Sequence, residues 1–414
     1  MKRKHLVDTK LSLLLAIVVL VSYSLIYMTK NCYSAAMASI VAEGIMTKSQ
    51  TGLITATFYI VYAPLQIVGG FAADKYSPHK LIIIGTVGAC VANLLIYFTQ
   101  SYVAMLIIWA LNGLAQFGIW PSVFKIISSE LTERHSVLAL VYVGLTTVLG
   151  TLLSYILAVF VSNWKNNFLI SAIVLFVVTV TFYISYTRVE KEMVVETAPT
   201  SQKTKALAEN NQKKKTFWLI LKSGTPFMFV VYIINNMLNL GIKSVAPVML
   251  MENYEGVTPS LANAFNIFFI LSGVLGIFVA SIKCFRRFSP ATVVAGFFAI
   301  ILPLLFVVSK IGRLDIAIII ASLSVSMLSF AASAVVFHRI SRAFAPYGCA
   351  ATVSGIFNCM ASIGLVLSNF FFTRFSDNFG WSFTTQFWFV LMALALVLCI
   401  IAIPFWKKFV KTLE

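Results

Sequence analysis

Apolar stretches of about twenty residues recur along the whole chain, and this pattern constrains the possible folds more than any other feature. A helix of that length and composition fits the hydrocarbon core of a lipid bilayer. The chain is 60% hydrophobic and only 11% charged, which is more apolar than the core of a soluble domain requires. The sequence therefore predicts an all-α, polytopic membrane protein.

Twelve membrane-spanning helices are predicted, six on each side of a polar segment. The segment at 188–215 is rich in Thr, Ser, Gln, Glu and Lys, and it is long enough to tether two bodies without fixing them. We therefore expect an N-terminal six-helix bundle at 1–187, a cytoplasmic linker at 188–215 and a C-terminal six-helix bundle at 216–414. The predicted spans are 11–42, 51–73, 80–99, 102–129, 136–162, 166–187, 216–251, 259–283, 290–309, 314–341, 348–374 and 382–406.

The net charge of +17 does not indicate nucleic-acid binding, because the positions of the charges follow the predicted topology. With the N-terminus inside, 24 of the 31 Lys and Arg residues fall at cytoplasmic ends and loops, five fall outside, and Lys30 and Lys243 fall within spans. This positive-inside asymmetry places both termini in the cytoplasm. The basic N-terminus followed by an apolar run is interpreted as an uncleaved first helix, since eleven more spans follow it.

Lys30 lies near the middle of the first span, where a positive charge is costly. An ammonium at the centre of a membrane helix costs roughly 2.5 to 3.5 kcal/mol, so it usually faces a watery cavity or a partner. All fourteen Asp and Glu residues fall at or beyond the predicted helix ends, so none of them neutralises Lys30 inside the membrane. The natural counter-ion is then a mobile one, an anionic substrate. The alternative is a structural role, with backbone carbonyls or hydroxyls around the ammonium.

The seventh span carries a polar stripe in an otherwise apolar helix. Asn235, Asn239 and Lys243 are spaced four residues apart and so lie on one helix face, with Asn236 beside them. Such a stripe is expected to face a cavity or a neighbouring helix, because lipid would leave its polar groups unpaired. Hydrogen bonding between helices, with Lys243 reaching outward, is the alternative.

Several motifs identify a family. Gly70-Phe-Ala-Ala-Asp74-Lys75-Tyr-Ser-Pro-His-Lys80 resembles the signature loop of the major facilitator superfamily, and the chain is similar to that superfamily over its full length. Tyr27-Met-Thr-Lys30, Gln116-Phe-Gly-Ile-Trp120-Pro121 and Asp377-Asn-Phe-Gly-Trp381 resemble its organophosphate:phosphate antiporter branch. The resemblance implies that Asp74, Lys75 and Lys80, in the cytoplasmic gating loop that begins at Gly70, clamp helix ends on the cytoplasmic face. It also implies two halves that rock about a midplane site, the arrangement of alternating-access transporters.

The resemblance also implies where the substrate binds. Family members of the organophosphate type hold phosphate with an arginine in the first span and another in the seventh; the first position matches Lys30 and the second Asn239. The paired guanidinium grip is therefore absent, and lysine does not replace arginine conservatively at a bidentate site. Gln66 and Thr146 stand where relatives carry a lysine and a histidine. The weaker positive field suits an anion that is smaller or less charged than a phosphate dianion. The predicted substrate is a small organic anion, either a phosphate ester or a sugar acid or other carboxylate.

The candidate substrate-binding residues combine these positions with further polar and aromatic residues inside spans, each of which has helix packing as its alternative role. They are Lys30, Tyr27, Tyr62, Gln66, Gln116, Trp120, Tyr142, Thr146, Asn235, Asn239, Lys243 and Asn358.

The predicted function is secondary active transport by alternating access, with exchange preferred, because no carboxylate or histidine is embedded in a span to carry a proton. Proton-coupled or facilitated uptake of a carboxylate or sugar is the alternative, and a transporter-like membrane sensor is a remote one. No GxSxG, HExxH, CxxC or P-loop motif occurs, so no enzyme activity, cofactor or metal is expected. We expect a functional monomer in the bacterial inner (plasma) membrane, with membrane lipid and a small anion as partners.

Overall fold

The computed structural model describes residues 2–161, 163–197, 223–280, 282, 285, 287–344 and 350–411. The chain forms two compact units. One contains Met1–Pro199 and Pro259–Ala264, and the other contains Thr200–Thr258 and Phe265–Glu414. The bundle boundaries at 187 and 216 stay predictions. Most of the predicted linker, the first residues of the predicted seventh span, Lys283, Cys284, Arg286 and Cys349 lie outside the described residues.

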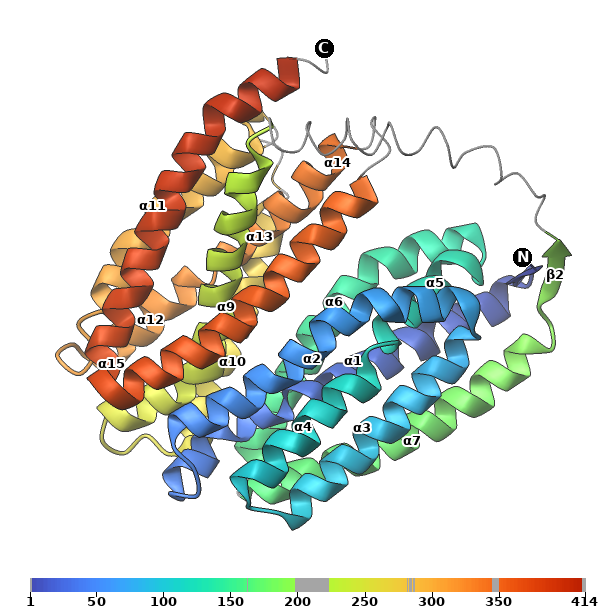
Figure 1. Cartoon of the computed structure of the whole chain (residues 1–414), viewed down its shortest axis with the longest axis horizontal. Coiled ribbons are helices and arrows are strands. Elements are labelled where there is room, and N and C mark those ends of the chain that lie inside the picture. The colour runs from blue at the N-terminus through green and yellow to red at the C-terminus, as the bar shows by residue number, and fades with distance from the viewer. Residues whose placement is uncertain are drawn as a thin grey trace. The chain divides into compact units, whose positions relative to one another are not determined.

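The N-terminal unit is helical, with α1 packed against α6 and α7, and α2 packed against α4 (Figure 1). Its helices are α1 (Thr9–Ala42), α2 (Lys48–Lys75), α3 (Pro78–Phe98), α4 (Tyr102–Gln116), α5 (Ile119–Ser129), α6 (Glu133–Phe160) and α7 (Trp164–Glu190).

The second unit is built around α9, which packs along α15, and α11 also packs against α15. Gly380 interrupts α15 with a positive φ of 78°, so α15 consists of two helical legs. The elements are α9 (Thr225–Asn253), α10 (Pro259–Ala280), α11 (Pro290–Val308), α12 (Ile316–Ser326), α13 (Ser329–Val335), the π-helix η2 (Val336–Ile340), α14 (Ser341–Ala343) and α15 (Ala350–Lys411). The first residues of α10, Pro259–Ala264, belong to the N-terminal unit.

Local sequence signals fix where many of these helices begin. The Asp8 carboxylate accepts hydrogen bonds from the backbone of Lys10 and Leu11 at the start of α1. Thr47 and Gln50 form a reciprocal capping box at the start of α2. Pro290 occupies the first turn of α11, where its missing N–H costs no hydrogen bond. Short polar caps therefore separate the long apolar segments.

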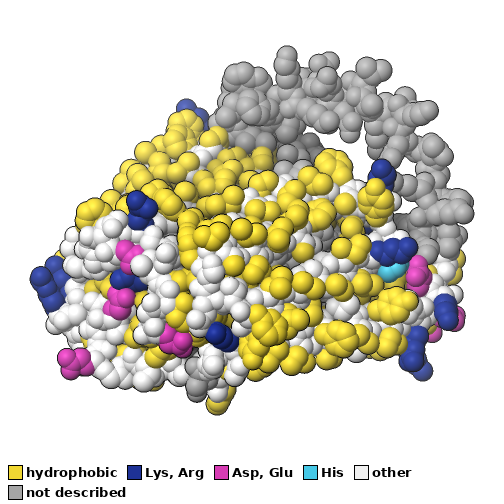
Figure 2. Space-filling model, turned by 60° about the horizontal axis from the view of Figure 1, so that its bottom comes forward, with side chains coloured by type: hydrophobic (Ala, Val, Ile, Leu, Met, Phe, Trp, Pro, Cys, Tyr) yellow, Lys and Arg dark blue, Asp and Glu magenta, His cyan; other side chains and the backbone are white. Residues whose placement is uncertain are grey.

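Ten helical segments in the described part of the chain are long and apolar enough to cross a membrane. The two legs of α15 count as one of these ten, and α2 is a further 28-residue helix outside them. Figure 2 shows hydrophobic side chains over much of the visible face, with few charged side chains among them. The protein is an integral, multi-pass membrane protein of the all-helical class. The count of twelve spans stays a prediction.

Two predicted spans are broken near their middles. The span at 102–129 divides at Phe117 and Gly118 into α4 and α5. Pro121 explains this break, because it lacks the N–H that would bond the Phe117 carbonyl four residues earlier. The span at 314–341 divides at Met327 and Leu328 into α12 and α13, and here no proline is present. Interrupted helices at corresponding places in two halves are a recurring mark of transporter binding regions.

An internal repeat relates α1 to α9. Gly150 on α6 approaches the backbone of Ser24 and Met28 and the Cβ atom of Tyr27 on α1. On α15, Gly364 approaches Ile233, Met237 and Asn236 of α9 through the same three kinds of atom. Each α9 residue number exceeds its α1 counterpart by 209, and Glu252 exceeds Glu43 by the same amount. Glu43 and Glu252 accept the indole hydrogen bonds of Trp164 and Trp381. We call this offset of 209 residues the repeat register, and in it Lys30 corresponds to Asn239.

A short β-ribbon is an addition to the all-helical prediction. Strands β1 (Lys2–His5) and β2 (Val194–Thr197) pair antiparallel, with Lys2 opposite Thr197. The next residue, Leu6, is buried and donates its N–H to the Glu130 carbonyl at 2.9 Å. The ribbon therefore ties the N-terminus to the segment that follows α7. The first residues of the predicted linker belong to the N-terminal unit.

Candidate functional site

The Lys30 ammonium lies among four aromatic rings in the N-terminal unit. Its Nζ is 3.8 Å from the ring centroid of Tyr62, 5.0 Å from Tyr59, 5.2 Å from Phe58 and 5.3 Å from Tyr27. Ring faces carry partial negative charge, so each contact attracts the ammonium. We call Tyr27, Phe58, Tyr59 and Tyr62 the aromatic cage. The cage stabilises the charge of Lys30 without neutralising it.

Helix geometry brings the cage together from two elements. Tyr27 precedes Lys30 by three residues on α1 and so lies on the same face. Phe58 and Tyr62 are four residues apart on α2, and their rings stack with centroids 5.4 Å apart. Tyr59 meets Tyr62 edge to face at 6.4 Å. Ring contacts thus hold the cage in shape before any ligand binds.

No carboxylate pairs with Lys30 among residues 2–161, 163–197 and the rest of the described chain. Lys30 is 9% exposed, so water reaches it poorly in this conformation. Burying a charge is costly unless it is paired, and four ring contacts of ~0.5–2 kcal/mol each offset that cost only in part. That a mobile anion pairs with the Lys30 ammonium stays a prediction.

Gln116 and Trp120 flank the break between α4 and α5. The Gln116 amide donates to Asn112 Oδ1 at 2.8 Å, and both side chains are buried. Trp120 packs on Tyr23 with centroids 5.4 Å apart, and Tyr23 in turn lies 6.1 Å from Tyr27 of the cage. Trp120 is thus connected to the cage through rings. A contact between either residue and substrate stays a prediction.

Four other predicted residues lie outside the cage, and one of them, Gln66, contacts it. Thr146 is buried, and its hydroxyl donates to the Val143 carbonyl of its own helix at 2.6 Å. Tyr142 on α6 is 52% exposed, and Asn358 on α15 is also exposed. Gln66 is half-buried on α2, one turn beyond Tyr62, and its side chain forms a hydrogen bond with the Tyr62 side chain. Their roles in binding stay predictions.

The predicted stripe on α9 contacts α13 in the second unit. The Asn235 amide donates to the Ser333 hydroxyl at 2.7 Å and to the Ser329 carbonyl at 3.2 Å. The Ser329 hydroxyl donates to Asn239 Oδ1 at 2.6 Å. The two asparagines are 1% and 0% exposed. Contact between helices, which was the alternative interpretation, therefore accounts for part of this stripe.

Lys243 is buried, so it does not reach outward to the membrane surface. Its Nζ lies 3.6 Å from the ring centroid of Phe330 on α13. In the repeat register Lys243 corresponds to Ser34, one turn beyond the Lys30 position. Among the described residues, each unit thus holds one buried lysine against an aromatic ring, at helix positions that do not correspond.

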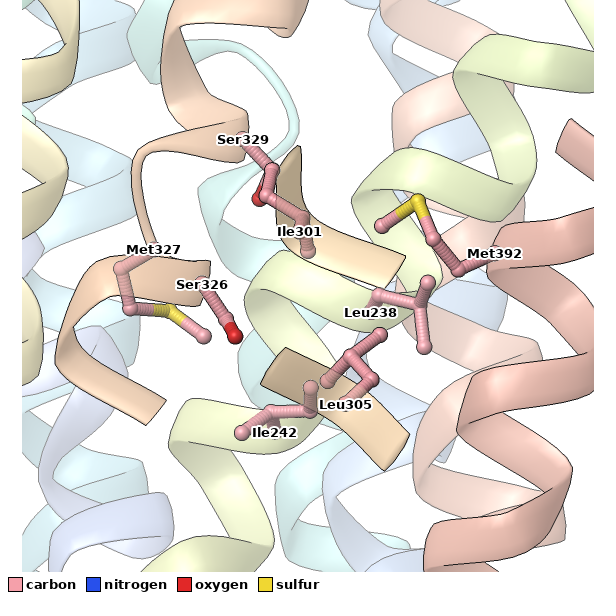
Figure 3. A pocket seen from close by; sticks show the side chains of 8 residues that line it. All are labelled: Leu238, Ile242, Ile301, Leu305, Ser326, Met327, Ser329 and Met392. Carbon is pink, nitrogen blue, oxygen red and sulfur yellow. The ribbon is translucent and has the colours of Figure 1, made fainter. Parts of the chain in front are cut away.

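A narrow crevice adjoins the break between α12 and α13, and Ser326, Met327 and Ser329 from this break line it (Figure 3). Its space is too narrow for a water molecule, so it is not an open substrate cavity in this conformation. The lining residues come from α9, α11, α15 and the broken span, and they are Leu238, Ile242, Ile301, Leu305, Ser326, Met327, Ser329 and Met392.

The predicted cytoplasmic-loop residues lie at the junction of α2 and α3. Gly70 is in the last turns of α2, Lys75 is its last residue, and Lys80 is an exposed residue of the first turn of α3. The side chain of Asp74 lies outside the described residues. Lys125, which the sequence did not place in the site, donates from α5 to the Ala73 carbonyl in the last turn of α2. A cation at a helix C-terminus is favourable there.

The structure adds residues that the sequence analysis missed. Phe58 and Tyr59 complete the cage, and their signal was the run of aromatic residues with helical spacing that includes Tyr62. Ser329 and Ser333 are four residues apart and so share a helix face, which could have suggested a partner for the asparagines. Within the described ranges, no group of three or more His, Cys, Asp and Glu could hold a metal ion.

The Tyr62 ring is expected to stabilise the protein through Lys30. Tyr62→Leu removes the closest ring face and is expected to cost about 1–2 kcal/mol of unfolding free energy, whereas Tyr62→Phe keeps the face and costs much less. Thermal unfolding of both variants in detergent, repeated in a Lys30→Met background, measures the coupling between the two side chains. A coupling below about 0.3 kcal/mol would mean that the ring only fills space.

Comparison with known proteins identifies a family of membrane proteins with the same helical fold. A profile of the Major Facilitator Superfamily matches residues 19–369. A bacterial homologue of the human lysosomal transporter Spinster, in an inward-facing and unoccupied conformation, has a similar fold with a TM-score of 0.74. The two chains are 15% identical, and the match covers 98% of each. At that identity the likeness shows the fold alone.

Sequence relatives match shorter segments. The membrane sensor protein UhpC of Salmonella typhimurium is 35% identical over 100 residues, which is 24% of this chain and 23% of that protein. A probable hexose phosphate transport protein of Chlamydia trachomatis is 26% identical over 26% of this chain and 23% of its own length. The hexuronate transporter of Bacillus subtilis is 25% identical over 50% of this chain and 49% of its own. The chain thus spans about a quarter to a half of the length of these relatives.

Proposed function

The chain belongs to the Major Facilitator Superfamily of membrane transporters, and on this basis we propose that it moves a small organic anion across the membrane by alternating access. The observation that carries this proposal is the Lys30 ammonium, held in the aromatic cage with no described carboxylate beside it. Two of the named relatives are a probable hexose phosphate transport protein and a hexuronate transporter, and hexose phosphates and hexuronates are both anions. A phosphate ester and a sugar acid or other carboxylate are the two substrate classes considered.

The absence of an arginine pair favours the carboxylate over the phosphate ester. The repeat register pairs Lys30 with Asn239, so the second unit has a neutral amide at the corresponding position. One compact ammonium matches the single charge of a carboxylate better than the two charges of a phosphate. Lys243 adds a second cation, one turn away from that position.

Exchange follows from the charge of the empty site. When an anion occupies Lys30, the buried charge is paired and the protein can change conformation with little electrostatic cost. When the site is empty, only the cage offsets the charge of Lys30, so the return step is slower. The proposed transport mode is therefore antiport. Proton-coupled or facilitated uptake is the alternative, and in that case an imposed pH gradient alone drives accumulation.

Counter-substrate inside vesicles is expected to accelerate uptake at least ~10-fold, because pairing an ammonium removes several kcal/mol of desolvation cost from the return step. The measurement is uptake of a labelled organic anion into proteoliposomes that are loaded or empty. Equal initial rates in loaded and empty vesicles would rule out obligatory exchange.

A membrane sensor is a second candidate, because the relative at 35% identity is named a membrane sensor protein. A sensor would bind the anion with the same lysine but would move little of it. Binding without uptake by the purified protein would favour the sensor, and uptake at rates above protein-free vesicles would favour the transporter.

The membrane setting is proposed from charge and relatives together. The predicted 24 to five excess of Lys and Arg on one side supports a cytoplasmic location for both termini. The relatives named above are bacterial, which favours the bacterial inner membrane. The cage lies within one unit of a single chain, so we propose that the monomer is the functional form.

A further inference from the structure

Asn266 on α10 fills a gap that a proline creates in α9. Pro247 lacks an N–H, so the Lys243 carbonyl four residues earlier loses its helical partner. The Asn266 amide nitrogen donates to this carbonyl at 2.8 Å. A carbonyl can only accept, so this bond fixes which end of the Asn266 amide is nitrogen. The Asn266 oxygen is left buried, without a partner among the described residues.

Asn235 also has a buried amide oxygen without a described partner. Its nitrogen donates to the backbone carbonyl of Ser329, which again fixes the orientation of the amide. Its oxygen is buried and finds no partner in the described part of the chain. Asn235 and Asn266 are 1% and 0% exposed. The second unit therefore holds two buried acceptor oxygens that require donors.

In Asn239 the unpaired group is the amide nitrogen, which is a donor. Its oxygen accepts from the Ser329 hydroxyl, and its nitrogen is a buried donor that no described group accepts. The Lys243 ammonium follows one turn later on α9. From Asn235 to Lys243 the helix advances ~12 Å. One unpaired acceptor, one unpaired donor and a cation thus lie along two turns of α9, and the second unpaired acceptor belongs to Asn266 of α10, which bonds the Lys243 carbonyl.

We propose that Asn235, Asn239 and Asn266 form a subsite that binds the hydroxyl groups of a hydroxylated organic acid. A phosphate or an unsubstituted carboxylate offers only acceptors, which cannot pair with the two asparagine oxygens. A hydroxyl group both donates and accepts, so it can pair with either kind of unpaired atom. This inference rests on the proposed transport of an organic anion and names the chemistry that distinguishes its substrate.

The test compares ligands that differ only in hydroxyl groups. Thermal stabilisation of the purified full chain is titrated with gluconate against hexanoate, with glycerate against propionate, and with sorbitol as the neutral polyol. In at least one pair the hydroxylated acid is expected to bind at least ~10-fold tighter, because sites built to bond a hydroxyl reject ligands without it. Sorbitol is expected to bind more weakly than gluconate, because it lacks the charge.

Two variants locate the effect. Asn235→Leu is expected to reduce the hydroxyl preference below ~3-fold, because the oxygen that requires a donor is gone. Asn236→Leu is the matched control, because it is the same substitution one residue later. The Asn236 amide donates within its own helix to the Tyr232 carbonyl, and Asn236 is not among the residues with a fully buried, unpaired polar atom. This control is expected to keep the preference of the parent.

Equal affinity within both acid pairs in the parent protein would overturn the subsite without needing any variant. A hydroxyl preference that survives in Asn235→Leu would overturn the assignment to these residues. In either case the proposed function stands if the acids bind the parent and fail to bind Lys30→Met. If none of the four acids binds the parent and no organic anion enters proteoliposomes, the proposed function itself fails and the subsite falls with it.

Discussion

Replacing Lys30 with methionine is expected to lower anion uptake into proteoliposomes at least ~100-fold, because loss of one partner of a desolvated charge pair costs about 2–5 kcal/mol. Methionine keeps much of the length and apolar volume of the side chain and removes only the charge. Lys30→Arg keeps the charge but not the compact shape, so it is expected to retain part of the uptake. The rates are compared at equal amounts of reconstituted protein.

The matched control is Lys191→Met, at an exposed lysine that caps the end of α7. This variant loses the same charge far along the chain from the cage and is expected to transport like the parent. If Lys30→Met retained more than about a third of the parent uptake, the substrate would not depend on an ion pair with Lys30, because losing such a pair lowers the rate far more.

Gly150→Val is expected to be the most damaging single change to the framework of the site. A Cβ atom at Gly150 would lie 2.4 Å from the Ser24 carbonyl oxygen and 2.8 Å from both the Met28 nitrogen and the Tyr27 Cβ atom. These are backbone atoms of α1 and the base of a cage residue, so the helices must separate. Overpacking costs about 1–3 kcal/mol where side chains can adjust, and backbone contacts adjust least.

We therefore expect Gly150→Val to lose at least about 2 kcal/mol of stability and most of its transport, measured by thermal unfolding and uptake. The control is Gly144→Val on the same helix, where an added Cβ atom meets nothing within 4 Å. Parent-like stability in both variants would mean that the close approach of α6 to α1 does not position Tyr27.

Much of the fold could be predicted because hydrophobic length and charge placement act locally. The break in the fourth span could also be anticipated, since Pro121 removes a backbone donor wherever it stands in a helix. The break at Met327 and Leu328 could not, because no proline marks it. There Ser326 donates back to the Ser322 carbonyl, and the Met327 N–H is shared between two carbonyls.

The site was partly predictable for a similar reason. Lys30 is conspicuous in the sequence, because a charge in the middle of an apolar span needs an explanation. Phe58 and Phe330 are ordinary apolar residues in apolar helices, and only packing between helices shows that they lie against ammonium groups. The partners of Asn235 are about a hundred residues away in the chain, so spacing alone could not identify Ser333.

The most direct test of the account is ligand binding with and without the Lys30 charge. The parent and Lys30→Met are screened by thermal shift against sugar phosphates, sugar acids and small dicarboxylates. At least one anion is expected to raise the unfolding temperature of the parent, and the same anion is expected to leave the unfolding temperature of Lys30→Met unchanged. Equal stabilisation of both proteins would contradict this expectation and leave the ammonium with a structural role only.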